Sequence, residues 1–233
     1  MRAVLPVLVT GILILQVSCV TFSHASSEGQ KEAGQRARSA HDSDDFSDIR
    51  AALVAAAYDV LGAESLEVRD RSFRIDCTGV VQAIYYSAGI DLIAPLGAYS
   101  GNGVVRLHSY LADEQLVHGG REALPGDLIF WDNTYDRNKS GRPDDKLTHV
   151  GMIVSVEDNG DIQYIHHNYA RGIVIEYMNL QTPEVHSRIE DGNTVIVNSF
   201  MRARSAPDYD KTLSGELINS LAQAYLLGDP DSD

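Results

Sequence analysis

The chain has 233 residues, of which 44% are hydrophobic and 22% are charged, and its formal net charge at pH 7 is −14. This length suits one domain with a targeting segment, and the composition is that of a folded globular protein. The excess of negative charge argues against nucleic acid and against an anionic lipid surface as the main partner.

Residues 1–25 have the pattern of an export signal. Arg2 precedes an uncharged apolar run that continues to Val17, and polar chain follows. The run is too short for a membrane span, so we interpret it as a cleavable signal. Cleavage after Ala25 and lipobox cleavage before Cys19, with lipidation of that cysteine, both remain open. Either route predicts export to the periplasm or cell envelope, and a lipid on Cys19 would be the only contact with a membrane.

The next segments predict a linker followed by helices. Residues 26–46 are polar and lack apolar periodicity, which is typical of a flexible linker. The folded domain is expected over residues 47–204. Apolar spacing predicts helices from Ser47 or Asp48 to Gly62, from Cys77 to Gly89, and over residues 104–116.

From Pro125 the apolar pattern changes to that of strands. A turn signal at residues 158–161 predicts a hairpin. Residues 205–233 are expected to form a helix, with Leu213, Leu217 and Leu221 at helical spacing, and an acidic tail. Helices followed by antiparallel strands predict an α+β domain. The predicted strands cover residues 127–131, 148–157, 161–168, 172–179 and 193–200.

Cys77 is the one thiol left once export processing has removed or lipidated Cys19. It has no cysteine to pair with, so it is a candidate nucleophile, whereas a cysteine that only packs in the core is the alternative. Its place in the first turn of a predicted helix would lower the pKa of the thiol through the backbone N–H groups and the helix dipole. Gly79 would allow a substrate backbone to approach closely.

His149 opens a predicted strand directly after a polar loop, where an imidazole can meet a sulfur carried by a helix. It would act as a general base toward Cys77 and then as an acid toward the leaving amine. The predicted hairpin returns beside it, and either His166 or Asn168 could orient its ring. Strand alternation places His167 on the opposite face.

Four blocks resemble, in order, those of the NlpC/P60 family of cell-wall cysteine peptidases: DCTG at 76–79, LPGDLIFW at 124–131, THVGMIV at 148–154 and YIHHN at 164–168. The resemblance implies a papain-like fold in which N-terminal helices, with the nucleophile at a helix start, pack on an antiparallel β-sheet. It implies a Cys77–His149–His166 triad that hydrolyses amide bonds in peptidoglycan stem peptides. No cofactor is required for this chemistry, and we expect a monomer.

Further residues are expected to support this site. Asp76, Thr78 and Asn168 are assigned supporting roles, Trp131 and Tyr135 are predicted substrate walls, and the Cys77 N–H is a candidate oxyanion donor. Two features depart from the family pattern. The tyrosine and paired glycines that usually precede the cysteine are absent, so stem-peptide specificity is not carried over. The 17 residues from His149 to His166 match the longer hairpin of CHAP amidases.

The loop before His149 resembles a calcium-binding loop. Asp136, Asn138, Ser140 and Asp144 stand at the ligand positions of such a loop, but Leu147 occupies the place of the usual final Glu. Asp145 or Asp132 would have to complete the shell. A bound calcium ion would be structural, and an ordinary polar loop is the alternative.

Two other functions are compatible with the sequence. One is a catalytically silent domain that binds or organises the cell wall. The other is a papain-like amidase or acyltransferase with a substrate outside the wall. A silent domain has no need of Cys77, His149 and His166 together, so their presence favours an enzyme.

Overall fold

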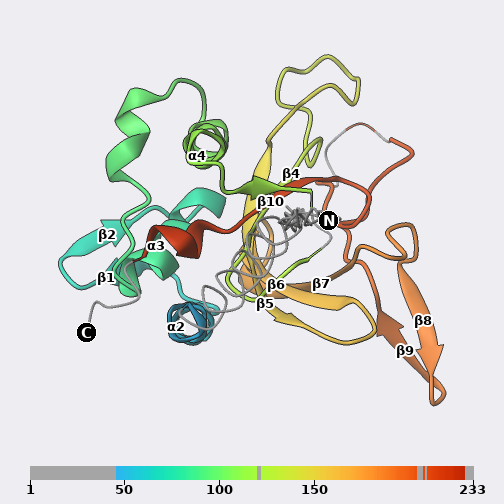
Figure 1. The fold of residues 1–233 in the computed structure, drawn as a ribbon. Coiled ribbons are helices and arrows are strands. Elements are labelled where there is room, and N and C mark those ends of the chain that lie inside the picture. Colours follow the sequence, from blue (N-terminus) through green and yellow to red (C-terminus); the bar gives the residue numbers. More distant parts are fainter. Residues whose placement is uncertain (1–45, 120–121, 204–206, 208, 229–233) are drawn as a thin grey trace, which may run out of the picture. The chain divides into compact units, whose positions relative to one another are not determined.

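The computed structural model describes residues 46–119, 122–203, 207 and 209–228 (Figure 1). The chain divides into two compact units, residues 1–42 and 43–233, and every described residue belongs to the second. The predicted export signal, Cys19 and the predicted linker up to residue 45 lie outside the described residues, and so does most of the predicted acidic tail. None of the described helices is both long and apolar enough to cross a membrane.

Three α-helices form where the apolar spacing predicts them: α2 (Ser47–Asp59), α3 (Cys77–Ser87) and α4 (Gly103–Asp113). Side chains cap the latter two, because Asp76 accepts a hydrogen bond from the Gly79 N–H and Asn102 accepts one from the Val105 N–H. A hairpin of β1 (Leu66–Val68) and β2 (Arg71–Phe73) precedes α3, and the 3-10 helix η1 (Ala94–Ala98) follows it.

The main sheet is antiparallel and has the strand order β3-β10-β4-β5-β6-β7. The predicted strands β4, β5, β6 and β7 are confirmed, and the hairpin joins β5 to β6. The expected α+β fold, with helices packed on an antiparallel sheet, is therefore confirmed. The strands are β3 (Val117–His118), β4 (Leu128–Trp131), β5 (His149–Val156), β6 (Asp161–Asn168), β7 (Gly172–Asn179) and β10 (Ile218–Ala222).

The predicted C-terminal helix is wrong. Residues 218–222 form β10, which lies between β3 and β4 in the sheet, and only the short 3-10 helix η2 (Ala224–Leu227) follows. Leu217 and Leu221 have a helical spacing, but in this structure their side chains are buried against β4. A short apolar run does not distinguish helix from strand, and pairing with two neighbouring strands decided the outcome.

The expected strand over residues 193–200 is shorter than predicted. Only β9 (Asn193–Ile196) forms, and it pairs with β8 (Ser187–Glu190) in a separate two-stranded sheet. This hairpin extends away from the main sheet (Figure 1). Ile189, at 70% exposed, lies on it.

The main sheet carries a hydrophobic core on each of its faces. One core joins the sheet to the helices, and it includes Ile84 of α3, Leu107 of α4 and Phe130 of β4. The other core lies around Trp131 and Tyr164 and is covered by the C-terminal segment through Leu217. Helix α3 packs directly on β5 and β6, and its N-terminal residue Cys77 lies beside Val150 near the start of β5.

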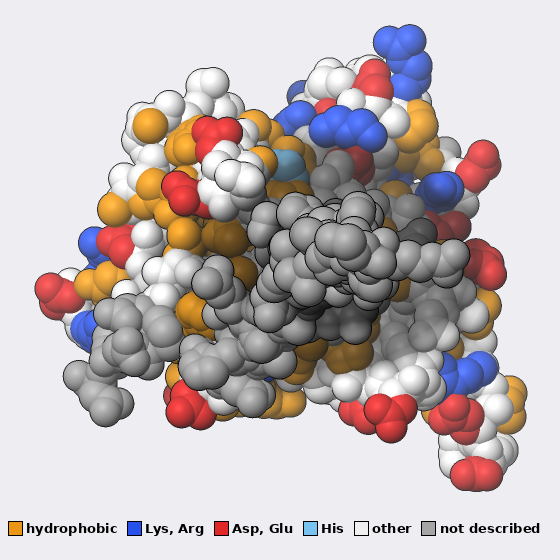
Figure 2. Space-filling view, viewed as in Figure 1, with side chains coloured by type: hydrophobic (Ala, Val, Ile, Leu, Met, Phe, Trp, Pro, Cys, Tyr) orange, Lys and Arg blue, Asp and Glu red, His pale blue; other side chains and the backbone are white. Residues whose placement is uncertain are grey.

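The negative charge of the chain does not gather in one patch on the face shown in Figure 2, where acidic side chains stand at several separate places. Lys and Arg side chains gather on that face over the loop between β4 and β5. Much of this positive charge is paired within the loop, since Lys146 contacts Asp132 at 2.9 Å and Arg137 lies 3.6 Å from Asp145.

Candidate active site

Asp76 organises the start of the helix that carries Cys77. Its Oδ1 accepts hydrogen bonds from the Gly79 N–H and the Thr78 hydroxyl, both at 2.8 Å, and its Oδ2 lies 3.1 Å from Arg74 Nε. These contacts hold the first turn of α3 in one conformation. Asp76 and Thr78 therefore support the position of Cys77 through the backbone.

Gly79 does not serve the role predicted for it. It is buried, and a Cβ at this position would lie 1.9 Å from the carbonyl oxygen of Arg74. The close approach is to the chain's own backbone and not to a substrate. A glycine is required here because the segment before Cys77 folds back against the first turn of α3.

Gly79→Ala is therefore expected to destabilise the fold by about 3 kcal/mol, because backbone atoms must move to admit the methyl group. Gly97→Ala is the matched control, since a Cβ at Gly97 meets nothing within 4 Å. Urea unfolding of both variants measures the difference. Equal stability of the two would show that the Arg74 carbonyl does not restrict position 79.

The Cys77 thiol is less acidic than the sequence suggests. Burial, followed by the negative charge of Asp76, raises its pKa to about 11. Backbone N–H groups of Val150 and Thr78 act in the opposite direction, but their effect is smaller. The prediction of a lowered thiol pKa is therefore wrong, because desolvation outweighs the helix N-terminus. The resting thiol is neutral at pH 7 and needs a base to become a nucleophile.

Alkylation of Cys77 by iodoacetamide should follow this pKa. We expect the rate to keep rising up to about pH 11, because the thiolate is the reactive form and about one thiol in a thousand is ionised at pH 8. Asp76→Asn keeps a capping oxygen and removes the charge, so its profile should shift to lower pH. Peptide mass spectrometry at each pH measures the rate at Cys77, and a plateau below pH 8 would contradict the expectation.

His149 and His166 are brought together by the β5–β6 hairpin. Their Nε2 and Nδ1 atoms lie 2.8 Å apart, and the two rings meet edge to face at 83°. Burial and the neighbouring His166 hold the pKa of His149 well below its usual range. Burial lowers the pKa of His166 to about 3. Both rings are therefore neutral near pH 7, and Nδ1 is the nitrogen of His149 that remains for Cys77.

The thiol lies beside the start of β5, since the N–H of Val150, the residue after His149, acts on the Cys77 sulfur. Among the described residues, no hydrogen bond joins Cys77 to His149, as is common before a substrate is bound. The assignment of Cys77, His149 and His166 as a triad stays a prediction that this arrangement supports.

The other residues of the YIHHN block are arranged differently. Asn168 donates a hydrogen bond to Glu176 at 3.2 Å, so it does not orient His149 in this structure. His167 is partly buried on the opposite face of β6, and Asp76 partly offsets the burial that lowers the pKa of His167. His167 therefore lies toward the segment that precedes Cys77.

Trp131 is not a substrate wall, and that prediction is wrong. Its side chain is fully buried, its Nε1–H donates to the Ser214 carbonyl at 2.8 Å, and its ring packs beside His149 at 5.7 Å. The C-terminal segment covers this face of β4 and so encloses Trp131. Tyr135 is 41% exposed, and its pKa is raised by burial with a smaller contribution from the nearby Cys77, so it stays a candidate for contact with substrate.

Sequence reasoning missed the buried carboxylate of Glu176 and its contact with the exposed Arg171. Glu176 lies 3.2 Å from His166 Nε2 and contacts the Arg171 guanidinium. A lone carboxylate in the otherwise apolar strand GIVIEYMN was the signal, because a buried charge needs a partner.

The loop between β4 and β5 is closed by its own hydrogen bonds. Asp136 accepts hydrogen bonds from the Ser140 and Gly141 N–H groups, at 3.1 and 3.0 Å, and Asp144 accepts one from Asn138 at 2.8 Å. Within the described part of the chain, no group of three or more His, Cys, Asp or Glu side chains is placed to hold a metal ion. A structural calcium ion stays a prediction.

That prediction is tested by thermal unfolding. If calcium binds at Asp136 and Asp144, a chelator should lower the melting temperature by several degrees, because a ligand that binds only the folded state stabilises it. Asp136→Asn should remove the difference between the two conditions. An unchanged melting temperature in the wild type would leave an ordinary polar loop.

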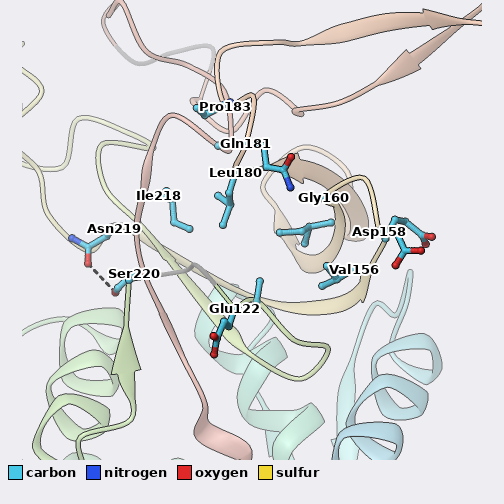
Figure 3. Close-up of a pocket in the computed structure, with 15 residues that line it drawn as sticks. Glu122, Val156, Asp158, Gly160, Leu180, Gln181, Pro183, Ile218, Asn219 and Ser220 are labelled. Carbon is cyan, nitrogen blue, oxygen red and sulfur yellow. Dashed lines mark hydrogen bonds between the residues drawn. The ribbon is translucent and has the colours of Figure 1, made fainter.

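A cavity of about 750 Å³ lies at the opposite end of β5 and β6 (Figure 3). Its apolar lining includes Val156, Ile162 and Ile218, and Glu122 and Asp158 lie at its edge. Its lining contains neither Cys77 nor His149, so this cavity is not the site of the predicted chemistry.

Comparison with known proteins supports the resemblance drawn from the motifs. The model of the NlpC/P60 family matches residues 59–189, which is more than half of the chain and includes Cys77, His149 and His166. No curated protein and no solved structure matched the chain.

Proposed function

The chain belongs to the NlpC/P60 family, and from this premise we propose that it is an exported cysteine peptidase or amidase that cleaves amide bonds in peptidoglycan stem peptides. Family membership supports a papain-like cysteine hydrolase acting on peptides. The observation that carries the proposal is the 2.8 Å contact between His149 and His166, together with the Val150 N–H beside the Cys77 sulfur near the start of β5.

In the proposed reaction, Cys77 Sγ attacks the carbonyl carbon while its proton passes to His149 Nδ1. The carbonyl electron pair moves to oxygen, where the Cys77 N–H can donate to the oxyanion. The tetrahedral intermediate expels the amine, which takes the proton from His149, and an acyl-enzyme remains. Water then attacks the acyl-enzyme, gives a proton to His149, and releases the acid and the thiol.

The neutral Cys77 thiol and the neutral His149 ring are consistent with this reaction order. Because the thiol pKa is about 11 and burial keeps His149 neutral, proton transfer accompanies attack and no thiolate accumulates beforehand.

The substrate and the location of the enzyme are tested with purified mature protein. Digestion of defined muropeptides, followed by mass spectrometry of the products, identifies the bond that is cut. New amines and carboxyl groups from the stem peptide would support the proposal. Turnover of other amides with none on muropeptides would favour an amidase or acyltransferase outside the wall, and fractionation of cells that express the full chain tests export and a lipid on Cys19.

A further inference from the structure

A chain of polar contacts continues behind His166. Glu176 lies on β7, and only 2% of it is exposed. Its Oε2 lies 3.2 Å from His166 Nε2 and accepts the Tyr164 hydroxyl at 3.2 Å. Its Oε1 accepts a hydrogen bond from Asn168 Nδ2 at 3.2 Å and contacts the guanidinium of Arg171. Burying a carboxylate is costly without a cation beside it, and the Arg171 guanidinium supplies that positive charge.

The ionised carboxylate determines where His166 carries its proton. A carboxylate offers only acceptors, and a nitrogen lone pair held 3.2 Å from it would be repelled. The proton of the neutral His166 ring is therefore favoured on Nε2, which leaves Nδ1 as an acceptor. Burial and the charge of Arg171 lower the pKa of His166, so the ring stays neutral beside the carboxylate.

The tautomer of His166 also determines which nitrogen of His149 carries the proton. Its Nε2 lies 2.8 Å from His166 Nδ1, and since that nitrogen accepts, His149 must donate from Nε2. Its Nδ1 then carries a lone pair, as a general base toward a thiol requires. The opposite arrangement would place a proton on Nδ1 and leave Cys77 without a base.

We propose that Glu176, with Arg171 as its counter-ion, is a positioning residue that sets the tautomers of His166 and His149. The proposal rests on the proposed function, in which His149 is the base for Cys77. Glu176 touches neither the thiol nor the substrate and acts only through the two rings.

Glu176→Gln tests the proposal, because an amide can donate or accept and no longer dictates the tautomer of His166. We expect kcat to fall about a hundredfold with KM nearly unchanged, since the wrong tautomer disables the base while binding is kept. Nitrogen-15 NMR of histidine-labelled protein reads the tautomers directly, and the Nδ1 signal of His149 should change from unprotonated to protonated. Glu176→Asp, which restores a carboxylate, should recover the wild-type signal.

Asp161→Asn is the matched control. It makes the same carboxylate-to-amide change in an ion pair with Arg188 at the other end of β6, and it should leave both histidine tautomers as they are. Unchanged tautomers and kcat in Glu176→Gln would overturn the proposal.

The wild-type spectrum decides the question even if Glu176→Gln fails to fold. A proton on His149 Nδ1 near pH 7 would overturn the assignment, and a proton on Nε2 of both rings would support it. Failure of the proposed function has a different signature. In that case the wild type would show these tautomers without turning over any peptide.

Discussion

Cys77→Ala should abolish amide hydrolysis, with kcat reduced on the order of 10⁶-fold, because no other group in the proposed site can form the acyl-enzyme. The fold should survive, since the side chain is only partly buried at the edge of the core between the helices and the sheet. Release of new amines from defined muropeptides, compared between wild type and variant, measures the loss.

Ser87→Ala is the matched control for this experiment. Ser87 lies at the other end of α3, where its hydroxyl donates to the Ile84 carbonyl at 2.7 Å. Substitution there perturbs the same helix without reaching the thiol, and activity should stay near that of the wild type. If wild type and Cys77→Ala release the same products, Cys77 is not the nucleophile. If neither releases any, the proposed hydrolysis of stem peptides is wrong.

His149→Ala should lower kcat by about a thousandfold or more, because the neutral thiol of Cys77 cannot be deprotonated efficiently near pH 7 without a base. The residual activity should rise as the pH approaches about 11, where the thiol ionises by itself. This rescue separates loss of a base from loss of structure, because a misfolded site would not recover on raising the pH. Steady-state rates from pH 6 to 10 give the comparison.

His167→Ala is the comparison that makes the assignment specific. His167 follows His166 on β6 but lies on the opposite face, toward Asp76. We expect its loss to change kcat by less than tenfold. An effect equal to that of His149→Ala would mean that His167 also acts in the deprotonation of Cys77.

Each of these expectations depends on the burial of the residues in the site. It makes Cys77 a weak acid, keeps both histidines neutral, and makes the contacts of Glu176 strong enough to determine a tautomer. A surface arrangement of the same residue types would have a thiol and imidazoles with ordinary pKa values. The surrounding core therefore contributes to the chemistry as directly as the residue types do.

Helices α2 to α4, strands β4 to β7 and the residues of the proposed triad followed from local sequence. Helix α3 has a capping Asp76 and apolar residues at helical spacing, and strands β4 to β7 have β-branched runs separated by turn residues, so neighbouring residues alone indicate them. The DCTG, LPGDLIFW, THVGMIV and YIHHN blocks likewise pointed to the NlpC/P60 family, which the family model confirms.

Tertiary structure decided what depends on residues far apart in the chain. The segment around Leu221 became a strand because β3 and β4 offered it partners on both sides. Trp131 is part of the core because the C-terminal segment covers it. Position 79 requires glycine because the segment before Cys77 folds back and brings the Arg74 carbonyl against it. The thiol pKa and the partnership of Glu176 with His166 depend on burial and on contact across strands, and neither is encoded in the spacing of residues along the sequence.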